Sequence, residues 1–128
     1  MLKTTGSELQ KLISSSPEAM VIVDGDGQIV QVNKELVKLF GYPAKALTGA
    51  KLEILLPESY RKKHAKHLRR YFANAAIRPM SAGLDLYGCR KDGTEFPIEV
   101  NLFPFETEQG VHAYAVIRDI STLKQTEA

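Results

Sequence analysis

The order of strand-like and helical patterns along the chain restricts its fold more than any single motif does. Two β-rich runs, Met20–Val23 and Gln28–Val32, flank Asp-Gly pairs that supply the positive φ angles of a tight hairpin. Short helical patterns follow, and three further strand-like runs occupy residues 83–90, 94–105 and 112–120. Strands joined by such short turns run antiparallel and leave the helices on one side. We therefore predict an α+β fold: a five-stranded antiparallel sheet with short helices on one face.

Capping residues divide the middle of the chain into several short helices. Asn33 is placed to cap the first helix and Gly41 to end it. Pro43 and Gly49 bound a second turn, and Pro57 opens a third helix in its first turn. The middle of the chain is therefore expected to form a wall of short helices rather than one long bundle helix.

Three residues of the late strands carry local predictions. Pro97 and Pro104 lie within the run at 94–105 and lack the backbone N–H that a sheet ladder uses. We therefore expect this strand to lie at a sheet edge or to be interrupted by bulges. His112, in the last strand, is expected to be exposed.

The composition is that of one soluble globular domain. The chain has 128 residues, of which 44% are hydrophobic and 25% are charged, which is enough for a single buried core. Its net charge of +2 gives no strong attraction to nucleic acid or anionic lipid, so neither partner is expected. The single cysteine, Cys89, permits no intrachain disulfide, and no apolar run approaches the roughly 20 residues of a membrane span. The first residues also lack the pattern of a signal peptide, so we expect a cytoplasmic domain.

Residues 1–15 have the pattern of a short flanking helix. Leu9, Leu12 and Ile13 fall at helical spacing, and Ser7 is a candidate cap. A helix this short and polar is not stable alone, so its apolar edge packs either on the domain or on a second copy of the chain. A homodimer through this helix is therefore one expected assembly.

Five segments stand in an order that resembles PAS domains, a family of sensor modules. They read SPEAMVIVDGDGQIVQVN, LFGYPAKALTG, LLPESYRKKH, RKDGTEFPIEV and IRDIS, and they span residues 16–121. The resemblance implies a ligand pocket beneath a helical wall, and a sensory role in signal transduction. It also implies an output segment at Asp119, Ile120 and Ser121, with residues 122–128 as the start of a linker helix. The linker would lead to an effector such as a histidine kinase of a two-component system or a cyclic-dinucleotide enzyme.

The segment YRKKHAKHLRRYF, residues 60–72, separates into two faces when it is placed on a helix. Tyr60, His64, Leu68 and Tyr71 share the apolar side, and the lysines and arginines occupy the opposite side. The basic residues are therefore expected to form a solvated back face and not a DNA-binding surface. If the PAS pattern holds, His64 faces the ligand pocket.

His64 is also the residue on which a haem hypothesis depends. Burial disfavours the charged imidazolium, so a neutral ring with one nitrogen lone pair is expected, and a haem iron requires that lone pair. The segment PESYRKKHAKHLRRY is similar to the one that carries the proximal histidine in FixL-type haem-PAS oxygen sensors. The resemblance implies b-type haem with His64 as the axial iron ligand. The candidate cofactor-binding residues are His64, Tyr60, Leu68, Tyr71, Met80, Leu84 and Leu86.

The resemblance to those oxygen sensors departs at one position. They carry an arginine that hydrogen-bonds bound oxygen where this chain has Leu84. The departure implies that CO, NO or a redox change is the signal, and Met80 is a candidate sixth ligand of the iron.

Other interpretations of the pocket remain open. His64 is also explained as a structural histidine that hydrogen-bonds within the core. The pocket then takes a small apolar ligand or a non-covalent flavin, and its candidate lining residues are Leu36, Leu39, Phe40, Leu55, Leu68 and Leu86. Alternatively, the domain acts as a dimerisation or protein-interaction module. The chain carries no Gly-rich phosphate loop, no GxSxG and no acid–base constellation, so it is predicted not to be an enzyme.

Overall fold

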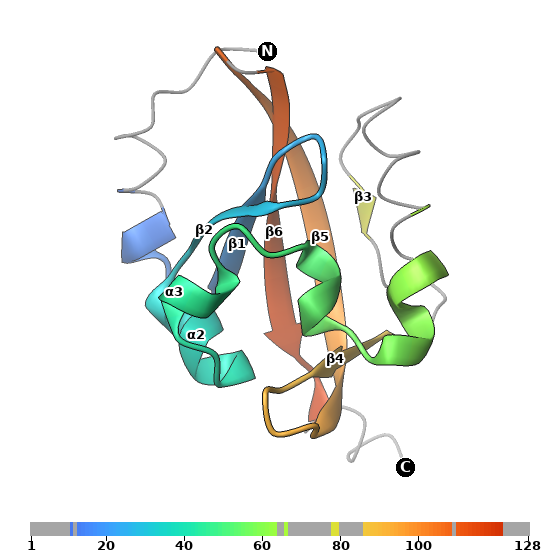
Figure 1. Ribbon diagram of the computed structural model, residues 1–128. Coiled ribbons are helices and arrows are strands. Elements are labelled where there is room, and N and C mark those ends of the chain that lie inside the picture. Colours follow the sequence, from blue (N-terminus) through green and yellow to red (C-terminus); the bar gives the residue numbers. More distant parts are fainter. Residues whose placement is uncertain are drawn as a thin grey trace.

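The computed structural model describes residues 11, 13–63, 66, 78–79, 86–108 and 110–121, which form a curled sheet with short helices against it (Figure 1). Residues 11 and 13–15 are helical, and so are residues 61–63 after η2. The α+β class predicted from the sequence is confirmed. In chain order the elements are β1 (Ala19–Val23), β2 (Ile29–Val32), α2 (Lys34–Phe40), α3 (Ala44–Leu47), η1 (Leu52–Leu55), η2 (Glu58–Tyr60), β3 (Arg78–Pro79), β4 (Tyr87–Cys89), β5 (Glu95–Thr107) and β6 (Gly110–Asp119).

The five predicted strands pair into one antiparallel sheet. The strand order is β2-β1-β6-β5, and both β4 and the short additional strand β3 pair with β5. β1 pairs with β6 from Ala19↔Ile117 to Val23↔Ala113. The first and last strands therefore lie side by side in the middle of the sheet (Figure 1).

The expected edge position of the proline-containing strand is wrong, because β5 lies between β6 and the two strands β3 and β4. Pro97 lies one residue beyond the last β5–β6 pair, Ile98↔Asp119, and its carbonyl accepts the N–H of Ile120. In the unbroken register, the nitrogen of Pro104 points away from β6, past the last described β3 pair at Leu102. Each missing N–H thus falls where a described ladder has ended, which is how the sheet tolerates both prolines.

The first hairpin closes as its Asp-Gly sequence predicts. The Asp24 N–H donates to the Gln28 carbonyl at 3.0 Å. The Asp24 carboxylate accepts from the N–H groups of Asp26 and Gln28 at 2.9 and 3.0 Å. Gly27 adopts φ 81°, a conformation that costs little only in glycine.

Helix α2 has the two caps predicted for it. The Asn33 side chain accepts the N–H of Leu36, and Gly41 takes a left-handed conformation at φ 78° while its N–H donates to the Val37 carbonyl. Leu36 and Phe40 are buried on the inner side of the helix. These caps place the end of α2 against the sheet.

The sheet buries side chains on both of its faces. The larger cluster fills the helix side and includes Val21, Val23, Ile29, Leu36, Phe40, Leu47, Leu55, Phe96, Ile98, Leu102, Ala113, Ala115 and Ile117. The opposite face carries a smaller cluster of Ile13, Met20, Ile22 and Phe105. Ile13 is only 1% exposed, so the described part of the N-terminal segment packs on its own domain.

His112 is buried, and its expected exposure is wrong, since only 7% of the residue is accessible. Its ring packs against Phe105 with the ring centroids 5.7 Å apart, and Nδ1 lies 3.4 Å from the Thr107 hydroxyl. Both neighbours belong to β5, and the β5–β6 pairing brings Phe105 directly opposite His112. The sequence pattern of a single strand could not predict this burial, because the contact joins residues of two strands.

Candidate ligand-binding site

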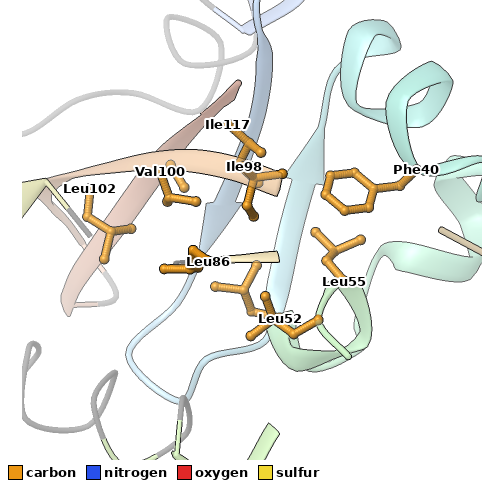
Figure 2. Close-up of a pocket in the computed structure, with 10 residues that line it drawn as sticks. Phe40, Leu52, Leu55, Leu86, Ile98, Val100, Leu102 and Ile117 are labelled. Carbon is orange, nitrogen blue, oxygen red and sulfur yellow. The ribbon is translucent and has the colours of Figure 1, made fainter. Parts of the chain in front are cut away.

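A cavity of about 30 Å³ lies between the helical wall and the inner face of the sheet (Figure 2). Strand alternation explains the sheet side, because every second residue of β5 and β6 faces the same way. The helical side comes from the last residue of α2 and from η1 with the residue after it. The described lining consists of apolar residues only: Phe40, Leu52, Leu55, Leu56, Leu86, Ile98, Val100, Leu102, Ala115 and Ile117.

The chemistry of this lining selects apolar guests. One water-sized group fits by volume, but no side chain of the described lining can donate or accept a hydrogen bond to hold a water molecule there. Apolar atoms gain about 25 cal/mol for each Å² of surface that leaves water. Pockets for drug-sized ligands span roughly 300–1,000 Å³, so a ligand larger than a few atoms has to displace lining side chains.

The structure describes only two of the predicted cofactor-binding residues, Leu86 and Tyr60. Leu86 lies in the cavity wall. Tyr60 is 41% exposed and lies outside the described lining. His64, Leu68, Tyr71, Met80 and Leu84 lie outside the described residues, so the haem site stays a prediction.

The alternative apolar pocket was anticipated in part. Phe40, Leu55 and Leu86 line the cavity, whereas Leu36 and Leu39 pack in the same core without lining it. Sequence reasoning did not name Ile98, Val100, Leu102, Ala115 and Ile117 as lining residues. The signal for three of them was present, because Ile98, Val100 and Leu102 alternate within a strand pattern.

Arg90 connects the wall of the cavity with the end of β6. Its Nε donates to the Leu39 carbonyl at 3.0 Å, and its Nη2 lies 3.5 Å from Asp119 Oδ2. The guanidinium also stands 4.0 Å from the centroid of the Phe96 ring, a cation–π contact. Sequence reasoning missed this residue, because its partners lie 51 and 29 positions away along the chain.

The contact between α2 and the β4–β5 hairpin depends on close aromatic packing. The rings of Phe40 and Phe96 have centroids 5.3 Å apart. The backbone N–H of Lys91 donates to the Phe40 carbonyl at 2.9 Å, so the hairpin satisfies the end of the helix. A Cβ on Gly88 would lie 2.9 Å from Phe40 Cε1 and 3.1 Å from Phe96 Cζ, so a larger residue at this position would force the rings to move.

Asp119 organises the predicted output segment. Its Oδ1 accepts from both the N–H and the hydroxyl of Ser121, at 2.9 and 2.5 Å. Its other carboxylate oxygen faces Arg90. Ser121 is helical, so Asp119 holds the point at which the strand gives way to the following segment.

Two charged groups have shifted pKa values. Hydrogen bonds from the Thr94 side chain and N–H hold the pKa of Asp92 below its ordinary value in the turn between β4 and β5. The hydrogen bond to Glu18, whose Oε1 lies 2.7 Å from Arg118 Nη2, raises the pKa of Arg118. The ion pair of Glu18 and Arg118 joins the residue before β1 to the end of β6.

Comparison with known proteins agrees with this geometry. The chain matches the PAS fold family over residues 7–120. It is 28% identical to the sensor protein FixL of Bradyrhizobium diazoefficiens over 127 residues, which is 99% of this chain and 25% of that protein. It is 23% identical over 120 residues to the cell-division control histidine kinase PdhS of Brucella ovis, which is 94% of this chain and 11% of that protein.

A solved structure shows the same fold. The PAS domain of a protein from Colwellia psychrerythraea superposes with a TM-score of 0.75 at 22% identity, over 91% of this chain and 97% of that one. The chain spans about a quarter or less of the length of the two curated relatives. The curled sheet with its helical wall and these matches agree on one class of domain, the PAS fold. This chain belongs to the PAS family.

Within the part of the chain that the structure describes, no helix has the length and apolar character needed to cross a bilayer. The same described residues contain no group of three or more His, Cys, Asp or Glu side chains arranged to hold a metal ion.

Proposed function

We propose that this PAS domain is the input module of a larger signalling protein, which binds a small ligand or cofactor in the apolar cavity and relays the change to a C-terminal effector. The observation that carries the proposal is the lining between α2, η1 and the inner face of β5 and β6, in which every described residue is apolar. Burial of an apolar guest against these described residues is favourable, and their side chains offer a polar substrate no hydrogen-bond partner.

The relay follows from the small size of the cavity. A guest larger than a few atoms moves side chains of the wall, and Phe40 is both a wall residue and the last residue of α2. The end of α2 is bonded to Arg90 and Lys91, and Arg90 pairs with Asp119. Movement of the wall therefore changes the contacts of Asp119, which is the first residue of the proposed output segment, Asp119–Ser121, and accepts the N–H of its last residue.

The first candidate cofactor is b-type haem with His64 as the axial iron ligand. The described lining matches the apolar faces of a porphyrin in its chemistry, since it presents carbon side chains only. A porphyrin has to displace side chains of the wall, because the cavity measures about 30 Å³. When bound, haem supplies an iron centre that takes a diatomic gas or changes its redox state. This chain contributes an apolar sheath, which excludes water and leaves the sheet side of the cavity without a hydrogen-bond donor among its described lining residues.

The haem proposal is tested by adding haemin to the full 128-residue chain and recording its visible spectrum. The expected result is a sharp Soret band that persists in His67→Ala and is lost in His64→Ala. His67 is the matched control because it is the neighbouring histidine of the same segment. An absent band, or one that survives His64→Ala, overturns the assignment of His64.

The second candidate is a small apolar ligand without haem, which the same lining favours. Native mass spectrometry of the purified chain is expected to find a bound small molecule that organic solvent releases. Replacement of Ala115 by Leu extends a side chain into the cavity, so Ala115→Leu is expected to abolish the adduct. An adduct that Ala115→Leu retains places the ligand elsewhere.

The assembly of the parent protein belongs to the same proposal. We propose residues 16–121 as the sensor unit, residues 1–15 as a flanking helix that also mediates a homodimer, and residues 122–128 as the start of a linker to a kinase-type effector. The single cysteine is consistent with a reducing, cytoplasmic setting. Light scattering at several concentrations tests the dimer.

A further inference from the structure

Asn33 is a buried side chain that uses its full hydrogen-bonding capacity between three elements. It is 5% exposed. Its Oδ1 accepts the N–H groups of Met20 in β1 and Leu36 in α2, each at 3.0 Å. Its Nδ2 donates to the carbonyls of Ile13 and Glu18, at 3.2 and 2.7 Å. An amide offers two acceptor and two donor positions, and all four are occupied.

The two halves of this amide serve different parts of the fold. The acceptor half caps α2, the helix that ends in the cavity residue Phe40. The donor half holds the N-terminal segment, defined here as residues 13–18, which Ile13 also fixes by packing with Met20 and Ile22 on the outer face of the sheet. One rigid side chain therefore links the helical wall on one face to the N-terminal segment on the other.

We propose that Asn33 is a positioning residue that couples the helical wall of the cavity to the docking of the N-terminal segment, giving the domain a second relay independent of Asp119. The inference deepens the proposed function and, as a regulatory route, rests on it. A shift of α2 that displaces its cap moves the amide, and the carbonyls of Ile13 and Glu18 lose their donor. The N-terminal segment then loosens from the sheet.

The first experiment separates the two halves of the amide with Asn33→Asp in the 128-residue chain. A carboxylate keeps the cap for α2, since Asp and Asn cap helices equally well, but it cannot donate to the N-terminal carbonyls. Amide hydrogen exchange, measured relative to Ala115 in the central strand β6, is expected to become about tenfold faster at Ser16 and Glu18. Exchange at Leu36 is expected to stay within about twofold.

The second experiment loosens α2 while Asn33 is unchanged, so it holds even if Asn33→Asp does not fold. Lys38 lies in α2 with 74% of its side chain exposed, and Lys38→Gly is expected to speed exchange at the Gly41 amide about fivefold. Coupling predicts that Ser16 and Glu18 follow by at least about threefold. The matched control is Lys45→Gly, at an exposed position in α3. It should leave the exchange rates of the Ser16 and Glu18 amides unchanged.

The outcomes decide the proposal without any ligand. Unchanged exchange at Ser16 in Asn33→Asp, or an equal increase at Ser16 and Leu36, overturns the separate donor role. If Lys38→Gly speeds exchange at the Gly41 amide but leaves exchange at Ser16 unchanged, the coupling between α2 and the N-terminal segment is overturned. The haemin spectrum and the mass measurement report on the cavity alone, so either proposal can fail while the other stands.

Discussion

The guanidinium of Arg90 lies 3.5 Å from the carboxylate of Asp119, and the same side chain donates to the last turn of α2 through the Leu39 carbonyl. Both charged side chains are 31% exposed. This pair joins the two places that the proposed relay has to connect, the wall of the cavity and the proposed output segment.

Replacing Arg90 by Gln is expected to lower the free energy of unfolding by about 2 kcal/mol. The loss combines the hydrogen bond to Leu39 with the cation–π contact to Phe96, and the partly exposed ion pair adds at most about 1 kcal/mol. Urea unfolding of Arg90→Gln, Asp119→Asn and the double variant measures these parts. We expect a coupling energy between Arg90 and Asp119 of about 1 kcal/mol or less. A coupling energy as large as the whole stability loss of Arg90→Gln would contradict the contributions assigned to Leu39 and Phe96.

Gly88→Ala is expected to cost about 1–3 kcal/mol, because the added methyl group meets the rings of Phe40 and Phe96 in a packed core. Gly25 offers the matched control. A Cβ there meets only the Val111 carbonyl at an ordinary 3.6 Å, so Gly25→Ala should stay within about 0.5 kcal/mol. Thermal unfolding compares the two variants, and equal stabilities would show that the ring contact is not tight.

Leu55 lines the cavity and is 2% exposed. Leu55→Ala is therefore expected to lower the free energy of unfolding by about 2–5 kcal/mol. The enlarged cavity should also take up small apolar molecules, so added benzene is expected to restore part of the lost stability. The control is Val30→Ala, at a position 45% exposed, with a change of about 0.5 kcal/mol or less. A Leu55→Ala chain that benzene does not stabilise would argue against an accessible apolar cavity.

The stability of the folded chain depends on pH through Asp92, and the pKa shift of this residue fixes the direction of the dependence. Its pKa in the folded chain lies below the ordinary value of 3.8, because Thr94 donates to the ionised carboxylate. The stabilisation is therefore present above about pH 4 and is lost as the pH falls through the folded pKa. Unfolding curves of the wild type and Asp92→Asn should diverge above that pH and converge below it. Parallel curves would mean that the carboxylate gains nothing from Thr94.

Local chemistry is the part of the fold that could be predicted from the sequence. The hairpin at Asp24 and the caps of α2 at Asn33 and Gly41 depend on residues within a few positions of each other. The short turns also predict the antiparallel pairing of β1 with β2, of β4 with β5 and of β5 with β6, but they do not predict the central pairing of β1 with β6.

The site was predicted only in part, because its main contacts join distant segments. Phe40, Leu55 and Leu86 were named from their apolar pattern, whereas the Arg90–Asp119 pair and the approach of Gly88 to Phe40 appear only after the hairpin folds against α2. The burial of His112 and the interior position of β5 have the same origin in strand pairing. The role of His64 stays a prediction.

The most direct test of the proposed relay is the amide chemical shift of Ser121 in Leu55→Ala, recorded with Arg90 intact and with Arg90→Gln. Ser121 donates its N–H to Asp119, and Leu55 lies in the cavity wall on a different element. The relay predicts a clear shift at Ser121 when Arg90 is present and little or none when it is replaced. An unmoved Ser121 resonance, or the same shift in both backgrounds, would contradict the connection between cavity and output.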